Sequence, residues 1–268
     1  MITSDNISFL EVKELRHYYN QPDGSRVEAL SLDYMPASRG EAIAVVGPSG
    51  SGKTTLLHIL AALIRPTCGE VLFDGRDIFA AGQTGALWRS ASVGYIFQEM
   101  NLLPDFSALE NILLAAEISS VPWVVARERA NSLLQRLDLW NQRNRRPADM
   151  SLGEQQRTAV ARAVVHSPSI ILADEPTASL DAENARIVMN ILTELCTESQ
   201  TLLIIATHDE AIKKRFERIV ELQRPTNTEP WGTARRPDKP TDPFCNYEEG
   251  AGSNLPARFG QRPRFCSC

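Results

Sequence analysis

Short apolar runs alternate with segments of helical spacing along the first part of the chain. Residues 7–19 and 27–32 have strand-like patterns on either side of a turn at 21–25, and we expect the first of them at a sheet edge. Residues 41–46 form an apolar run typical of a buried strand, and residues 55–63 have the spacing of a helix. Further strands are expected at residues 69–75 and 93–97.

The middle of the chain changes to helical spacing. Ser107 and Glu110 form the pattern of a capping box, which predicts a helix that ends near residue 118. Residues 124–140 place apolar side chains on one helical face and arginines on the other. Ser151 is expected to open a further helix.

The pattern then returns to strands. Residues 170–173 are all apolar, as expected of a parallel strand that is covered on both faces. A helix at about 182–197 and a strand at 201–206 follow in βαβ order, and the last strand-like run is 219–222. This order predicts an α/β fold with a parallel sheet.

Composition limits the possible partners. The chain has 268 residues, 43% of them hydrophobic, and a net charge of −5, which argues against a protein that coats nucleic acid. No apolar run approaches the length needed to cross a bilayer, so we expect any membrane role to depend on a partner. Residues 224–268 are rich in proline and lack periodicity, and this predicts a disordered tail.

A phosphate-binding pattern follows the strand at 41–46. Residues 47–54 read GPSGSGKT and match G-x-x-x-x-G-K-[ST], the loop that wraps nucleotide phosphates. Its glycines allow a tight backbone whose N–H groups point at one anion, and Lys53 would add a cation near the β- and γ-phosphates. The Thr54 hydroxyl would ligate Mg²⁺. We therefore predict that the chain binds a nucleoside triphosphate.

Polar residues after other predicted strands complete a second half of this site. Asp174 and Glu175 follow the apolar strand, where ligands bind in open α/β sheets. Asp174 can hold Mg²⁺, and Glu175 can orient and deprotonate the attacking water. Gln98 could reach the metal or the water, and His208 could bridge the γ-phosphate and the catalytic acid. Asp181 could face a second subunit.

Together these motifs resemble the ATP-binding-cassette ATPases. The resemblance is carried in order by residues 47–54, Gln98, 151–155 (SLGEQ), 172–175 (LADE), 179–181 (SLD) and His208. It implies a P-loop NTPase with a RecA-like α/β core, an antiparallel β subdomain and a helical insertion at about 99–163, all within residues 1–223. It also implies an ATPase that uses ATP and Mg²⁺.

The resemblance implies that two copies close head to tail and trap two ATP between them. The phosphate loop of one copy would face the Ser151 region of the other, and Tyr19 would stack on adenine, with Tyr18 as the fallback. It assigns catalytic roles to Glu175, His208 and Gln98, and metal contacts to Thr54, Gln98 and Asp174. The predicted nucleotide contacts are Tyr19, Gly47, Pro48, Ser49, Gly50, Ser51, Gly52, Lys53, Thr54, Thr55, Ser151, Gly153, Glu154 and Asp181.

Residues 102–111 (LLPDFSALEN) and Glu154 are similar to the lipoprotein-release and macrolide-export group within this family. That similarity implies an integral membrane permease as partner, docked after Gln98, and a place on the cytoplasmic face of the inner membrane. An ATPase subunit of an importer is the nearest alternative.

Leu152 departs from the family pattern, which has glycine there. If the backbone needs a left-handed conformation or a very close approach, the side chain would cost about 1–2 kcal/mol. We therefore expect an active but slow ATPase, and a slow ATP-binding regulator is a second alternative. A soluble cassette acting on DNA or ribosomes is disfavoured, because the chain has one cassette and no zinc module or long coiled coil.

Overall fold

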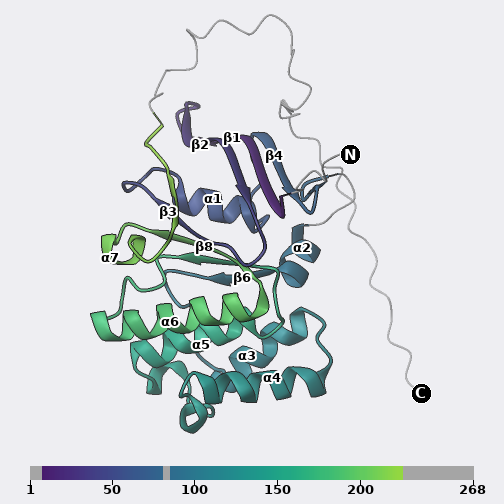
Figure 1. Cartoon of the computed structure of the whole chain (residues 1–268), viewed down its shortest axis with the longest axis vertical. Coiled ribbons are helices and arrows are strands. Elements are labelled where there is room, and N and C mark those ends of the chain that lie inside the picture. Colours follow the sequence, from purple (N-terminus) through teal and green to yellow (C-terminus); the bar gives the residue numbers. More distant parts are fainter. Residues whose placement is uncertain (1–7, 81–84, 226–268) are drawn as a thin grey trace, which may run out of the picture.

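The computed structural model describes residues 8–80 and 85–225, which form two sheets with helices between and below them (Figure 1). The upper sheet has the order β2-β1-β4-β5, and the lower sheet has the order β6-β7-β8-β3-β9. The mixed α/β architecture expected from the sequence is confirmed.

The upper sheet is antiparallel. It contains β1 (Leu10–Asn20), β2 (Arg26–Ala37), β4 (Cys68–Phe73) and β5 (Arg76–Asp77). The first strand was expected at an edge, and that prediction is wrong, because β1 pairs with β2 on one side and β4 on the other. The physical reason is that β4, more than forty residues further along the chain, returns to pair with the free edge of β1, a long-range contact that the local pattern does not reveal.

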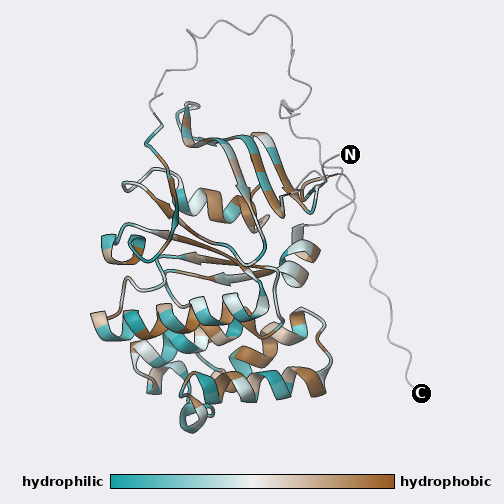
Figure 2. Ribbon diagram, viewed as in Figure 1, coloured by the Kyte–Doolittle hydropathy of each residue, from teal (hydrophilic) through white to brown (hydrophobic). Residues whose placement is uncertain are grey.

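The lower sheet is parallel and forms the centre of the molecule. Its strands are β3 (Ala42–Val46), β6 (Val93–Ile96), β7 (Ile170–Asp174), β8 (Leu202–Thr207) and β9 (Arg218–Glu221). Every residue of β7 and β8 is buried, which explains why both strands are apolar up to their last residues, Asp174 and Thr207 (Figure 2).

Helices cover both faces of this sheet. Helix α1 (Lys53–Leu60) lies between the two sheets, and its leucines and isoleucine join a core cluster with residues of both. Helix α6 (Ala182–Ser199) covers the opposite face together with α5 (Leu152–Val164). Two short helices, α2 (Gly85–Ser92) and α7 (Glu210–Lys213), were not predicted from the sequence.

A third core cluster joins α3 (Ala108–Ile118), α4 (Trp123–Arg136) and α5 at the bottom of Figure 1. The predicted capping box of α3 is confirmed: the Ser107 hydroxyl accepts a bond from the Glu110 amide, and the Glu110 carboxylate accepts one from the Ser107 amide. Helix α4 ends earlier than predicted, because Asp138 turns the chain with a positive φ of 53°. Short 3₁₀ turns at Trp140–Gln142 and Pro147–Asp149 lead to α5.

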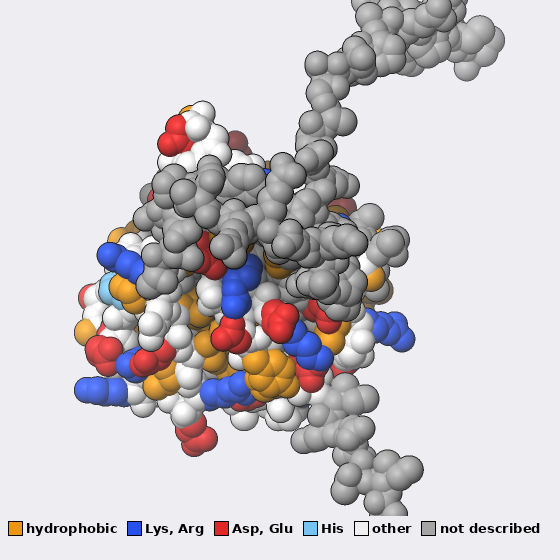
Figure 3. Space-filling model, turned by 90° about the horizontal axis from the view of Figure 1, so that it is seen from above, with side chains coloured by type: hydrophobic (Ala, Val, Ile, Leu, Met, Phe, Trp, Pro, Cys, Tyr) orange, Lys and Arg blue, Asp and Glu red, His pale blue; other side chains and the backbone are white. Residues whose placement is uncertain are grey.

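Among the described residues, no helix has both the length and the apolar character needed to cross a membrane. On the surface seen from above, acidic and basic side chains are interspersed rather than gathered by sign (Figure 3). Of the predicted tail, Arg224 and Pro225 are described, and the rest lies outside the described residues.

Candidate functional site

The carboxyl ends of four parallel strands meet at one cavity of about 470 Å³. Strand β3 leads into the phosphate loop, β6 leads to Gln98, β7 ends in Asp174 and Glu175, and β8 leads to His208. Their common edge brings together residues far apart in sequence, as the parallel order requires. The cavity, which we call the phosphate cavity, is lined by Ser49, Gly50, Gly52, Lys53, Thr54, Thr55, Gln98, Asp174, Glu175 and His208.

The phosphate loop depends on two glycines with left-handed backbone. Gly50 has φ +78° and Gly52 has φ +93°, values that strain an L side chain. At Gly52 a Cβ atom would also collide with the carbonyl oxygen of Ala29 in β2. Gly52 is the N-cap of α1, so the free N–H groups of that helix face the cavity. The helix begins at Lys53, two residues before the predicted start.

Lys53 is held over the loop by the loop itself. Its Nζ donates to the carbonyl oxygens of Gly47 at 2.8 Å and Pro48 at 3.2 Å. Gly47 and Pro48 line a neighbouring pocket rather than the phosphate cavity, and Ser51 is buried beneath the loop. None of these three predicted nucleotide contacts therefore lines the phosphate cavity.

The Asp174 carboxyl is 6% exposed at the floor of the cavity. Burial raises its pKa above the usual range and the charge of Glu175 adds to this, whereas a hydrogen bond from Thr54 and the nearby His58 and Lys53 act in the opposite direction. Thr54, Gln98 and Asp174 supply hydroxyl, amide and carboxylate oxygens to one cavity, and this hard donor set fits Mg²⁺. No cluster of three or more His, Cys, Asp or Glu side chains suited to a metal occurs in residues 8–80 and 85–225, so phosphate oxygens would have to complete the coordination.

Glu175 is fixed in a strained backbone conformation. Its φ of 46° lies in the left-handed region, and its amide donates to the Ala206 carbonyl at 2.9 Å. One carboxylate oxygen lies 2.6 Å from Nδ1 of His208, and the other accepts from the Thr207 hydroxyl at 3.2 Å. Such strain persists where surrounding bonds impose it. Here Thr207, in β8, and His208, directly after it, hold the Glu175 carboxylate in a fixed position.

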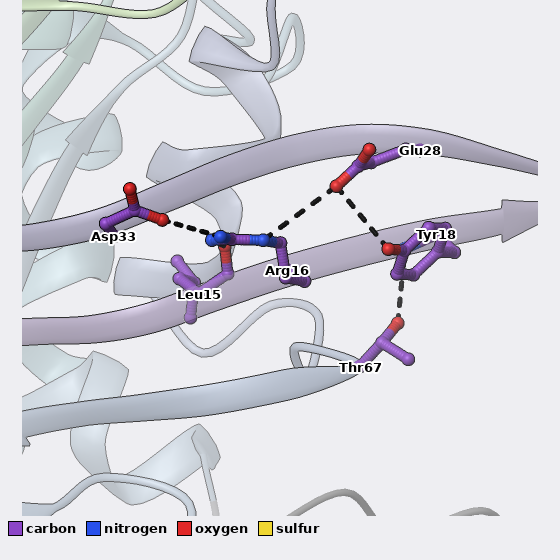
Figure 4. Close-up of polar contacts among 6 residues, drawn as sticks. All are labelled: Leu15, Arg16, Tyr18, Glu28, Asp33 and Thr67. Atoms are coloured by element: carbon purple, nitrogen blue, oxygen red, sulfur yellow. Dashed lines mark hydrogen bonds and ion pairs between the residues drawn. The ribbon is translucent and has the colours of Figure 1, made fainter. Parts of the chain in front are cut away.

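The two candidate adenine-stacking tyrosines differ in their surroundings, because the β1–β2 register shifts between His17 and Tyr18. Tyr18 is tied into the sheet: its amide donates to Thr67 and its hydroxyl lies 3.5 Å from Glu28 (Figure 4). Tyr19 is 45% exposed and presents its ring at the end of the strand. Tyr19 is therefore better placed than Tyr18 to stack on a base, although neither lines the phosphate cavity.

Four predicted nucleotide contacts lie together at the starts of α5 and α6, outside the phosphate cavity: Ser151, Gly153, Glu154 and Asp181. We call this group the α5–α6 edge. Ser151 caps α5 in a second capping box with Glu154, and Asp181 caps α6. Although partial burial raises the pKa of Glu154, bonds from the Ser151 backbone and hydroxyl outweigh it and lower the pKa.

Leu152 is the first residue of α5, follows a Ser151 cap with φ −65°, and is not among the residues with positive φ. The left-handed backbone considered from the sequence is therefore not found. Leu152 is 53% exposed, so about half of its surface is available to a second copy.

The sequence did not single out three residues that shape these sites. Thr207 holds the Glu175 carboxylate, Arg224 donates from Nε to the Ser49 carbonyl at 3.0 Å, and Asn184 bonds Asp181. Arg224 was assigned to the tail because a prolyl residue follows it. Only Thr207, which precedes the predicted His208, could have been found from its position in the sequence.

Comparisons with known proteins agree with this geometry. The ABC transporter family matches residues 33–178. The chain is 42% identical to a lipoprotein-releasing system ATP-binding protein of Syntrophus aciditrophicus, covering 80% of this chain and 96% of that protein. It is 38% identical to a macrolide export ATP-binding/permease protein of Nitrosomonas europaea, covering 83% of this chain and 34% of that protein. A dimeric ATP-binding cassette, MJ0796, bound to ADP and phosphate after hydrolysis, matches with a TM-score of 0.73 and 33% identity, covering 80% of this chain and 94% of that chain.

Proposed function

Because the chain belongs to the ABC transporter family, we propose that it is the ATP-hydrolysing subunit of a membrane exporter of the lipoprotein-releasing or macrolide-exporting type. The observation that carries the proposal is the phosphate cavity, which unites a phosphate loop with Asp174, Glu175 and His208. Residues 1–223 would form the nucleotide-binding domain, with residues 99–163 as its helical part.

Within the cavity each group has one task. The N–H groups at the start of α1 bind the phosphates, and Lys53 leaves its loop carbonyls to neutralise the β- and γ-phosphates. Glu175, aimed by Thr207 and His208, orients the attacking water and takes its proton. A bound Mg²⁺, held by Thr54, Gln98 and Asp174, would stabilise the charge on the phosphate oxygens. Tyr19 supports the adenine from the end of β1.

The α5–α6 edge completes the site of a second copy. Ser151, Gly153, Glu154 and Asp181 cannot act in their own chain's cavity, because none of them lines it. Head-to-tail association would place this edge over the phosphates bound by a partner, and the dimeric cassette MJ0796 has the same fold. Two copies would then enclose two ATP molecules.

An integral membrane permease, which this chain would contact from the cytoplasmic face of the inner membrane, is the remaining partner. Leu103 and Phe106, on the segment between Gln98 and α3, expose about two fifths of their surface and offer an apolar docking point. Arg162 on α5 holds this segment by donating to the carbonyls of Met100 and Asn101 at 2.7 and 2.6 Å. Movement of the helical part would therefore be transmitted to the docking segment.

The test is capture of the partner by the Glu175→Gln variant, purified from its host in mild detergent with Mg-ATP. That variant should keep ATP and stay associated with its permease. A permease with few spans and a large periplasmic domain supports the proposal, whereas a many-span permease would point to an importer. Lys53→Ala is the matched control, because it should lose ATP and with it the ATP-dependent capture.

A further inference from the structure

Asn184, in the first turn of α6, links two parts of the α5–α6 edge. Its amide donates to Oδ1 of Asp181 at 2.9 Å, and its side-chain Nδ2 donates to Oδ2 at 2.7 Å. Both oxygens of that carboxylate are therefore held by one residue. An ordinary helix cap needs only the bond from a backbone amide, so the bond from the Asn184 side chain restrains the Asp181 carboxylate further.

The other end of the Asn184 carboxamide lies against α5. A Cβ placed on Gly153 would lie 2.6 Å from Oδ1 of Asn184 and 3.0 Å from its Cγ. Gly153 is buried and has no positive φ, so a methyl group at this position would not strain the backbone but would displace the Asn184 carboxamide. A carboxylate only accepts hydrogen bonds, and this orients the carboxamide with nitrogen toward Asp181 and oxygen toward Gly153.

The segment between Glu175, directly after β7, and Asp181 consists of hydrogen-bonded turns. The amide of Ala178 donates to the Glu175 carbonyl at 3.1 Å, and the amide of Leu180 donates to the Thr177 carbonyl at 3.0 Å. Two consecutive turns thus connect Glu175 to Asp181. Asn184 therefore lies between the start of α5 and a short hydrogen-bonded segment that leads back to Glu175.

We propose that Asn184 is a positioning residue that joins the Asp181 carboxylate to the start of α5, so that both are presented to a second copy as one unit. The inference rests on the proposed function, because it concerns how the α5–α6 edge closes over a partner's ATP. Asn184 itself does not line the phosphate cavity.

The test measures ATP-dependent dimerisation in the Glu175→Gln background by sedimentation velocity with Mg-ATP. Asn184→Ala should weaken dimerisation about tenfold or more, because the Asp181 carboxylate and the start of α5 are then no longer held together where each copy meets its partner. Asn184→Asp should weaken it further, since two carboxylates would then face each other. Binding of a fluorescent ATP analogue to the monomer and the melting temperature without nucleotide should stay close to the parent. Arg186→Ala, at an exposed position of the same helix, is the control.

A double substitution tests the contact with α5. Gly153→Ala should weaken dimerisation because its methyl group displaces Asn184, and adding Asn184→Ala should cause little further loss. If the dimerisation constant of the double variant falls by the product of the two single losses, the inference is overturned. It is also overturned if the Asn184→Ala protein dimerises like its parent, or if its monomer no longer binds ATP. If the Glu175→Gln parent itself stays monomeric in Mg-ATP, the proposed function fails instead.

Discussion

The phosphate cavity and the α5–α6 edge both combine helix N-termini with polar side chains, but only the first encloses a space within one chain. The cavity gathers ten residues from four strand ends around one space of about 470 Å³. The edge gathers Ser151, Gly153, Glu154 and Asp181 at two helix starts, and none of them lines the phosphate cavity. Both use helix N-termini, which favour anions.

Under the proposed function, the phosphate cavity is the half-site that each chain completes by itself, and the α5–α6 edge is the half-site that acts only on a second copy. Changes in the cavity should therefore affect nucleotide binding or chemistry in a single chain. Changes at the edge should leave that binding intact and act only when two copies meet.

The largest effect is expected at Glu175. Glu175→Gln should lower ATP hydrolysis roughly 10²–10⁴-fold, because the amide cannot take the proton of the attacking water. ATP binding should persist, since the phosphate loop is untouched. Phosphate release and ATP binding measured on the same protein check this, with Glu183→Gln, an exposed glutamate on α6, as the control. A hydrolysis rate of the Glu175→Gln variant within twofold of wild type would show that Glu175 is not the general base.

The next largest effect is expected from Ser151, which can be compared with Ser107 because both serines form capping boxes but only Ser151 belongs to the α5–α6 edge. Ser107→Ala and Ser151→Ala each remove a capping box, and each should cost about 1 kcal/mol of stability. Only Ser151→Ala should also slow hydrolysis, by about tenfold, because its hydroxyl is needed at the partner's phosphate. Melting temperatures and turnover measured side by side check this. Equal turnover in the two variants would show that the edge has no part in hydrolysis.

Leu152 should give a smaller change. Leu152→Gly should raise turnover by up to about tenfold by clearing the edge for the partner's phosphates, while lowering stability by roughly 0.5–1 kcal/mol through helix propensity. Leu152→Ala separates the causes: since the backbone is already helical, alanine should give most of the gain. An unchanged or lower rate for the glycine variant would mean that Leu152 is no defect.

The smallest effect concerns Asp174 without nucleotide. Burial raises its pKa in the folded state, so its contribution to stability is greatest below the unfolded pKa and is lost as the pH rises through the folded value. Asp174→Asn should therefore raise the melting temperature of the nucleotide-free protein near pH 7, and this gain should vanish below about pH 4. Thermal unfolding across this range checks it; a gain that grows on acidification would contradict the burial argument.

Much of the cavity could be predicted because its residues sit at the ends of strands with clear apolar patterns. The phosphate loop, Gln98, Asp174, Glu175 and His208 all meet as a parallel sheet requires. Features that depend on contacts between residues far apart in the sequence could not be predicted. The interior position of β1 is set by pairing with β4, the φ of Glu175 by the Ala206 carbonyl, and the role of Asn184 by its distance from Gly153. None of these leaves a local pattern.

The most direct test of the two half-sites is sedimentation of Glu175→Gln and of Glu175→Gln combined with Gly153→Asp, each with and without Mg-ATP. The account predicts that the first protein dimerises only with Mg-ATP, and that the second binds ATP equally well but stays monomeric, because the new side chain displaces Asn184 and adds a negative charge to the edge that meets the partner's phosphates. A single variant that binds ATP without dimerising, or a double variant that dimerises normally, would contradict the claim that the edge completes the cavity of a second copy.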